Sequence, residues 1–255
     1  MTIYSNKAQL EKIANYLTAY MRIPYFQDDS IPGKIMEKII SLVRDAKQLS
    51  TYDYVDVVRK NDVGWQVKST QDSTPLTWKR AKIPDSERLI KESERSDEAR
   101  QILGDIIIEF CNNHAKESMS LYNLNEIGYS RLIFFSDLSA VYFERLLCTP
   151  DKPNIFDKND YIWHWSEPKK ASDSSKKEQL PAFHGVSKKT GKKVFAWHGK
   201  GENQLHFSGE KNWWPEVDRP PVEGVFNYSA DNHAIAFKLP SKKVEWDELS
   251  LFLNE

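Results

Sequence analysis

Asp56, Gln66 and Lys68 are the residues whose types and spacing are best suited to chemistry. A carboxylate beside an amide oxygen offers the hard oxygen ligands that Mg²⁺ prefers. A lysine beside such an ion can orient or deprotonate a metal-bound water, and attack of that water on phosphorus is a route to phosphodiester hydrolysis. An ordinary surface ion pair is the alternative interpretation of an aspartate near a lysine on a hairpin.

A predicted β-hairpin is the element that brings these residues together. β-branched and aromatic residues flank the polar group Lys60-Asn61-Asp62, which predicts strands over about residues 52–59 and 63–69. A three-residue loop of this kind pairs Arg59 with Val63.

The same register, continued away from the loop, places Asp56 opposite Gln66. Lys68 joins them because side chains two residues apart lie on one face of a strand. Asp53 falls on the other face unless a bulge intervenes, so it is the second choice as a ligand.

Two neighbouring features favour the chemical interpretation. The hairpin is largely apolar and therefore belongs to a core, where charged side chains need a reason. A second helix is predicted just before the hairpin, from about residue 32 to residue 49. Glu37 lies on it between Met36 and Ile39, where its carboxylate can serve as a second metal or water ligand. A solvated helix face is the alternative for Glu37.

The pattern resembles the PD-(D/E)XK nuclease superfamily and, within it, the type II restriction endonucleases. Three segments carry the resemblance, in the family's order: Gly33-Lys-Ile-Met-Glu37, Val55-Asp56-Val-Val and Trp65-Gln66-Val67-Lys68-Ser69. With the order of elements predicted for residues 32–137, the resemblance covers about 40% of the chain and does not reach its C-terminal region.

The resemblance implies a role for each residue. Asp56 matches the metal-binding aspartate, and Gln66 occupies the variable second-ligand position. The Val67 carbonyl completes the metal site, Lys68 serves the attacking water, and Glu37 matches the helix acid. The implied cofactor is Mg²⁺.

This sequence departs from the family pattern at two positions. Val55 stands where a proline usually precedes the aspartate, and Gln66 replaces the usual acid, which makes a QxK variant. Losing that charge weakens the metal affinity unless Glu37 or Asp53 compensates.

A basic region follows in the second half of the chain. Residues 169–200 hold nine lysines against two acids, in a chain whose net charge is −1. Lysines can neutralise phosphates, while Asn, Gln and His reach base edges. The expected DNA-binding residues are Trp78, Lys79, Arg80, Lys188, Lys189, Lys192, Lys193, His198, Asn203, Gln204 and His206. A solubilising loop is the alternative.

Other chemistries have less support. His198, Asn203 and His206 do not match the spacing of a zinc or HNH site, and both cysteines are remote from them. No glycine-rich nucleotide-binding motif is present.

The remaining pattern predicts a mixed α/β (α+β) fold. Residues 32–137 follow an order similar to the family's αβββαβ core, with a third strand at 75–83, a helical region from Asp85 or Ser96 to about residue 116 and a strand at 131–135. A further helix is expected after this core, at 138–147. Short strands are expected at 161–165, 194–198 and 204–207, and a closing helix at 246–253. We expect a nuclease core over residues 1–150 and a β-rich recognition region over 151–255, with one continuous domain as the alternative.

Composition narrows the class of protein. Hydrophobic residues make up 40% and aromatic residues 12%, which is typical of a globular chain. No apolar run is long enough for a membrane span, and no secretory signal is visible. With two cysteines, a reduced, prokaryotic cytoplasmic location is expected.

The sequence therefore predicts a Mg²⁺-dependent type II restriction endonuclease that cuts double-stranded DNA. Such an enzyme often acts as a homodimer and works alongside a cognate DNA methyltransferase. A repair or junction-resolving nuclease of the same fold, a non-cleaving DNA-binding protein and a scaffold protein remain alternatives.

Overall fold

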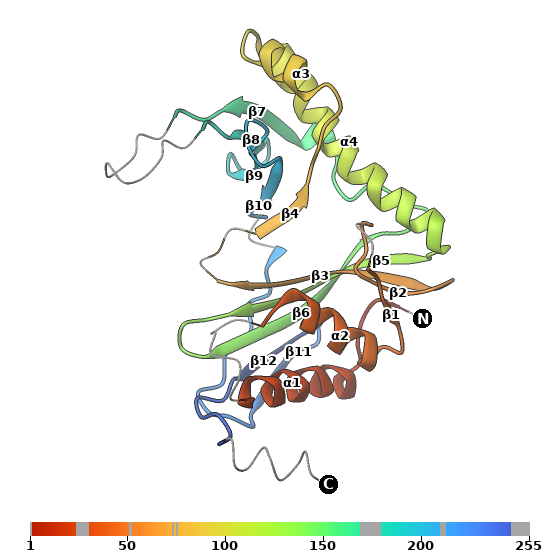
Figure 1. Cartoon of the computed structure of the whole chain (residues 1–255), viewed down its shortest axis with the longest axis vertical. Helices are drawn as coiled ribbons and strands as arrows, with labels where there is room; N and C mark the ends of the chain where they lie inside the picture. The colour runs from red at the N-terminus through yellow and green to blue at the C-terminus, as the bar shows by residue number, and fades with distance from the viewer. Residues whose placement is uncertain are drawn as a thin grey trace. The chain divides into compact units, whose positions relative to one another are not determined.

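The hairpin expected near residue 60 is present in the computed structural model. Strands β2 (Val57–Arg59) and β3 (Val63–Gln71) pair in antiparallel register, with Arg59 opposite Val63. The structure describes residues 2–23, 31–50, 53–72, 74, 76–168, 180–209 and 213–245. Within these ranges the chain is a mixed α/β protein with four helices and two sheets (Figure 1).

The chain divides into two compact units, and each is built from separate stretches of sequence. Unit 1 consists of Met1–Thr74, Glu117–Lys152 and Pro215–Glu255. Unit 2 consists of Pro75–Lys116 and Pro153–Trp214.

Unit 1 holds a seven-stranded sheet. Its strands in spatial order are β1 (Lys47–Gln48), β2, β3, β5 (Glu126–Phe134), β6 (Ser139–Cys148), β12 (Ala234–Lys238) and β11 (Phe226–Ser229). β3 and β5 pair in parallel, while the other neighbours are antiparallel. A parallel pair needs a long crossover, which the chain between β3 and β5 supplies.

Helices α1 (Lys7–Arg22) and α2 (Gly33–Val43) pack with the sheet of unit 1 (Figure 1). Apolar residues at helical spacing on α1 face the sheet, as an amphipathic helix requires. The buried cluster that they form includes Leu10, Ile13, Leu17, Met36, Ile40, Val57, Val63, Trp65, Val67, Leu132, Tyr142, Ile235 and Phe237.

The second helix ends earlier than the expected residue 49. Asp45 has a positive φ of 49°, and the Ala46 N–H donates to the Ser41 carbonyl at 2.9 Å. This is the Schellman arrangement, which stops a helix and satisfies its last carbonyls. The chain leaves it to form β1, and Arg44 at the C-cap turns into the core.

Unit 2 holds a five-stranded antiparallel sheet. Its strands in spatial order are β4 (Leu76–Arg80), β10 (Gln204–Phe207), β9 (Lys193–Trp197), β8 (Phe183–Ser187) and β7 (Tyr161–Trp165). Helix α3 (Ser86–Ser93) and most of α4 (Asp97–Tyr122) belong to the same unit. Closely spaced aromatic rings form its core, among them Trp78, Phe156, Phe195, Phe207 and Trp213.

The strands expected at 161–165, 194–198 and 204–207 are confirmed as β7, β9 and β10, with small differences at their ends. The strand expected at 75–83 forms as β4, but it pairs with β10 and does not extend the hairpin. The expected boundary at residue 150 therefore differs from the observed division, because each unit takes strands from both sides of it.

The prediction of a helix at 138–147 is wrong, since this segment forms strand β6. β6 lies between β5 and β12. A central strand of this kind can be buried on both faces, so its apolar run shows no alternation and is hard to tell from a buried helix.

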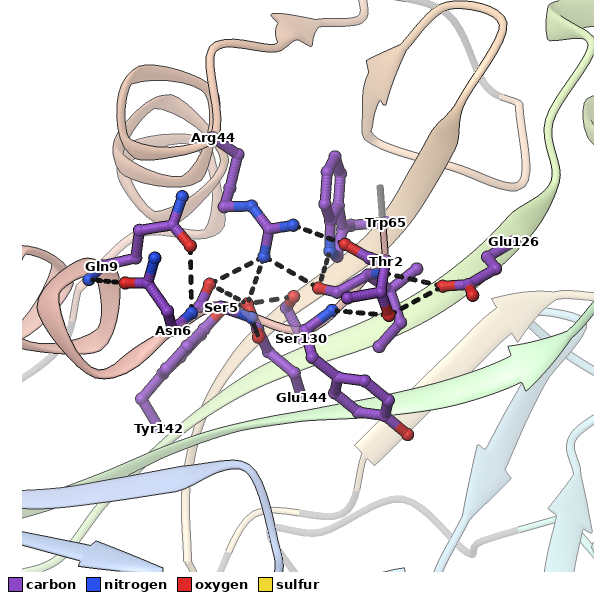
Figure 2. Close-up of polar contacts among 12 residues, drawn as sticks. Thr2, Ser5, Asn6, Gln9, Arg44, Trp65, Glu126, Ser130, Tyr142 and Glu144 are labelled. Atoms are coloured by element: carbon purple, nitrogen blue, oxygen red, sulfur yellow. Dashed lines mark hydrogen bonds and ion pairs between the residues drawn. The ribbon is translucent and has the colours of Figure 1, made fainter. Parts of the chain in front are cut away.

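A buried polar network ties the N-terminal segment to β3 (Figure 2). The Arg44 guanidinium donates to the Ile3 carbonyl at 2.9 Å and to the Ser5 hydroxyl at 2.8 Å. Glu144 accepts from the Ser5 hydroxyl and lies 3.8 Å from Arg44. The Trp65 indole donates to the Ile3 carbonyl at 3.0 Å.

Of the helices in the described ranges, none combines the length and the apolar character needed to span a membrane. The closing helix expected at 246–253 and the lysines at 169, 170, 176 and 177 lie outside the described residues.

Candidate functional site

The site begins at Asp56, the residue directly before β2. The Asp56 N–H donates to the Trp65 carbonyl at 2.8 Å, which continues the ladder by one bond. Beyond it, the Asp56 carboxylate accepts the N–H of Val67 at 2.8 Å. A side-chain oxygen thus takes the place of a backbone acceptor, which fixes the carboxylate against the middle of β3.

Three residues of β3 lie near this carboxylate: Gln66, Val67 and Lys68. Gln66, which is 3% exposed, lies opposite Asp56 in the continued register. The carbonyl of Val67 points to the same edge as its N–H, because both groups of a strand residue point to one side. The Lys68 ammonium is the largest charge acting on Asp56, and it favours the ionised form.

Helix α2 adds a second carboxylate. Glu37 is 6% exposed and accepts from the Lys34 ammonium at 2.7 Å and from the Gln48 amide at 2.9 Å. Its negative charge acts on Asp56 and raises the pKa of that carboxyl. The expected approach of Glu37 to the hairpin is therefore observed.

The pKa of Asp56 is raised above its usual value. Burial is the largest cause, because it removes water from the charged form. Lys68, the Val67 N–H and Lys34 act in the opposite direction, while Glu37 adds to the increase. Two carboxylates crowded in this way are the arrangement that a divalent cation relieves.

Sequence reasoning missed two residues of this site, Lys34 and Gln48. The three-residue spacing of Lys34 and Glu37 on one helix is a signal that points to their contact. Gln48 gave no such signal, because it was expected inside the helix and lies on β1.

Asp53, the second-choice ligand, is engaged elsewhere. Its carboxylate accepts from the Tyr122 hydroxyl at 2.5 Å, at the end of α4. The structure thus brings Asp56, Gln66, Lys68 and Glu37 into one site and places Asp53 in a separate contact.

The donor set suits a hard cation. The two carboxylates, the Gln66 amide and the Val67 carbonyl are all oxygen donors of the kind that Mg²⁺ takes alongside waters. The part of the chain that the structure describes contains no group of three or more His, Cys, Asp or Glu side chains that could hold a metal ion. A cation here therefore depends on the amide and the carbonyl as well as on the acids.

The prediction that Trp78 binds DNA is wrong. Trp78 is 0% exposed, and its ring lies 5.0 Å from that of Phe207 and 5.2 Å from that of Phe156. Its side chain is part of the core of unit 2 and is not available to DNA. Its neighbours on β4 differ, because Arg80 is exposed and Lys79 half-buried.

The expected lysines of unit 2 gather in one exposed turn between β8 and β9. We call the segment 188–193 the lysine turn; its exposed cationic residues are Lys188, Lys189, Lys192 and Lys193. Gly191 has a φ of 66°, which this tight turn requires, and the Ser187 N–H donates to the Lys192 carbonyl at 2.9 Å.

The four remaining residues expected to bind DNA lie close together in unit 2: His198, Asn203, Gln204 and His206. The imidazole of His206 is 3.1 Å from the Gln204 amide oxygen, and its ring centroid is 4.7 Å from that of His198. Asn203, with a φ of 56°, closes the turn before β10, and its N–H donates to the His198 carbonyl at 3.1 Å.

Comparisons with known proteins found no relative of this chain. No protein-family model, no curated protein and no solved structure matches the chain. The functional argument therefore depends on the site itself.

Proposed function

We propose that this chain is a Mg²⁺-dependent endonuclease of the type II restriction class, which hydrolyses phosphodiester bonds in double-stranded DNA. One observation carries the proposal. The Asp56 carboxylate is held on β3 by the Val67 N–H, with Lys68 and Glu37 both acting electrostatically on it.

The order of elements supports a restriction-endonuclease-like core. α2, β1, β2, β3, α4 and β5 follow one another as αβββαβ once the added helix α3 and strand β4 are set aside. In this arrangement the three strands are β1, β2 and β3, whereas the sequence pattern assigned the three positions to strands at 52–59, 63–69 and 75–83. The parallel pairing of β3 with β5 is consistent with a crossover helix between them.

The chain's own groups divide the work as follows. Asp56, Glu37, Gln66 and the Val67 carbonyl would hold the cation, which would neutralise phosphate charge and lower the pKa of a bound water. The Lys68 ammonium would orient the attacking water by donating a hydrogen bond to it and would stabilise the negative charge that develops on the phosphate oxygens. Gln66 carries no charge, so the two acids must supply the negative charge of the site.

Unit 2 would hold the substrate. The lysine turn, with Arg80 and Lys79, can neutralise backbone phosphates. A cytoplasmic enzyme of this kind would pair with a DNA methyltransferase that protects the host, and a homodimer would cut both strands.

Incubation of the full chain with phage DNA tests the proposal. With Mg²⁺, discrete fragments are expected, and EDTA should abolish them. A preference for branched DNA would favour the junction-resolving alternative. DNA that is retarded in a gel but not cut would indicate a DNA-binding protein without cleavage activity. If the protein neither binds nor cuts the DNA, the proposal is contradicted altogether.

A further inference from the structure

The sheet of unit 2 carries a row of imidazoles on the face opposite its aromatic core. His164 of β7 is in register with His184 of β8, and His184 with Ala196 of β9. Ala196 is in register with His206 of β10, and His206 with Thr77 of β4. Because side chains alternate along each strand, the buried neighbours of these residues point to the other face.

Four of the six histidines of the chain lie in or beside this row. His198 directly follows β9, and its ring centroid lies 4.7 Å from that of His206. The rings of His164 and His184 are 5.7 Å apart. We call this set, His164, His184, His198 and His206, the histidine row.

Charges of both signs act on the His198–His206 pair. Lys193 acts on both imidazoles and lowers their pKa, and His198 acts on His206 in the same direction. Glu202 is the acid that acts on both. Partial burial is the largest cause, and the pKa of each ring lies below its usual value.

We propose that the histidine row, with the adjoining lysine turn, is the face on which unit 2 docks the phosphate backbone of DNA, and that the His198–His206 pair takes up a proton from solvent as the DNA binds. The proposal rests on the proposed function, since it assigns a surface to the same substrate. Charge complementarity favours DNA as the partner of this surface, because a polyanion suits lysines and protonatable imidazoles together.

The direction of the pH dependence follows from the charges. In the free protein, burial lowers the pKa of both imidazoles against the opposing effect of Glu202, whereas a phosphate placed against them favours the charged form. The pKa of the pair therefore rises on binding. Affinity must then increase as the pH falls through the interval between the bound and the free pKa values. A protonated imidazole also donates from both ring nitrogens, which suits phosphate oxygens.

The test measures the dissociation constant of the full chain for a fluorescent DNA duplex by anisotropy, in EDTA so that no strand is cut. Lowering the pH from about 8 to about 5.5 should tighten binding at least about tenfold, since uptake of one proton raises the affinity up to tenfold for each pH unit between the free and the bound pKa. The double variant His198→Asn/His206→Asn should lose most of this change. His233→Asn, an imidazole in unit 1 stacked on Tyr4, is the matched control and should keep it.

Histidine NMR gives a second readout that a change in fold cannot mimic. Addition of duplex DNA should raise the pKa of two imidazoles in the wild-type chain, and neither signal should remain in the double variant.

Two outcomes overturn the inference. The first is a double variant that binds DNA with the wild-type pH dependence, and the second is a dependence that appears only when zinc is added. In both cases Mg²⁺-dependent cleavage by the wild type would leave the proposed function standing. A chain that neither binds nor cuts DNA at any pH would overturn both proposals.

Discussion

At the scale of single residues, Asp56 is held in a position that costs stability. Its carboxyl is partly buried and lies near a second acid, so the pKa is raised and ionisation is disfavoured. The Val67 N–H and Lys68 offset part of this cost. Ionisable groups whose charged form is disfavoured by their surroundings are common where a protein binds a cation or a substrate.

Replacing Asp56 with asparagine should therefore stabilise the protein at neutral pH. The folded-state pKa is raised, so the unfavourable contribution appears as the pH rises through that pKa and is absent in acid. The variant keeps an oxygen acceptor for the Val67 N–H. Thermal unfolding should give a higher Tm than wild type near pH 7 and an equal one in acid.

Added Mg²⁺ should raise the Tm of the wild type and leave Asp56→Asn unchanged. A variant that is less stable at neutral pH, or that is stabilised by Mg²⁺ as the wild type is, would contradict this account of Asp56.

Much of the site follows from the sequence at this scale. The polar loop at residues 60–62 determines the register of the hairpin, and the register places Asp56 against β3. Trp78 could not be assigned correctly, because a tryptophan beside two basic residues suits a core as well as a nucleic-acid surface. Its burial depends on rings that are distant in the sequence.

At the scale of elements, strand β3 is supported from the face opposite the candidate site. Trp65 alternates with Gln66 along the strand, and the Arg44 guanidinium lies over its ring, 4.8 Å from the centroid. Burial raises the pKa of Glu144, and Arg44 is the first group that acts against this increase (Figure 2). The network thus couples the N-terminal segment, the end of α2 and β6 to the strand that carries Lys68.

The variant Arg44→Met should leave the Glu144 carboxylate buried without its cation. Breaking a buried pair in this way costs about 3–5 kcal/mol. Because the pKa of Glu144 would rise further, the loss should be larger at alkaline than at acidic pH. Urea denaturation measures it.

Arg88→Met is the matched control, since Arg88 is 61% exposed and pairs with Glu92 across one helical turn. Its loss should be much smaller than that of Arg44→Met, because an exposed ion pair contributes little to stability. Equal losses for the two variants would show that the buried network does not support the strand.

Element types were harder to predict than the hairpin. β6 is buried over consecutive residues, so it shows no strand-like alternation of exposed and buried positions. No local pattern in residues 138–147 reveals that its partner β12 arrives from almost 90 residues later. The pairing of β4 with β10 is similarly distant in sequence. Local propensity cannot encode such partners.

At the scale of the whole molecule, the two units suit separate tasks. The acids and Lys68 belong to unit 1, and the lysine turn and the histidine row belong to unit 2. The net charge of −1 hides this separation, since the positive charge is local. Binding and cleavage should therefore respond to different substitutions.

Replacing Lys188, Lys189, Lys192 and Lys193 with alanine should weaken DNA binding without changing its sequence preference. The logarithm of the binding constant should then depend less steeply on the logarithm of salt concentration, by up to about 3 to 4 in slope. A salt titration of duplex binding measures this, and an unchanged slope would remove the lysine turn from the DNA-binding surface.

The most direct measurement compares cleavage rates of the wild type, Lys68→Ala and Lys60→Ala on the same DNA duplex with saturating Mg²⁺. Lys60 is an exposed lysine in the loop of the same hairpin and controls for loss of charge. We expect Lys68→Ala to cut about 10²–10⁴-fold more slowly while its DNA affinity is nearly unchanged, and Lys60→Ala to cut at the wild-type rate. Wild-type cleavage by Lys68→Ala would show that the ammonium beside Asp56 takes no part in the reaction.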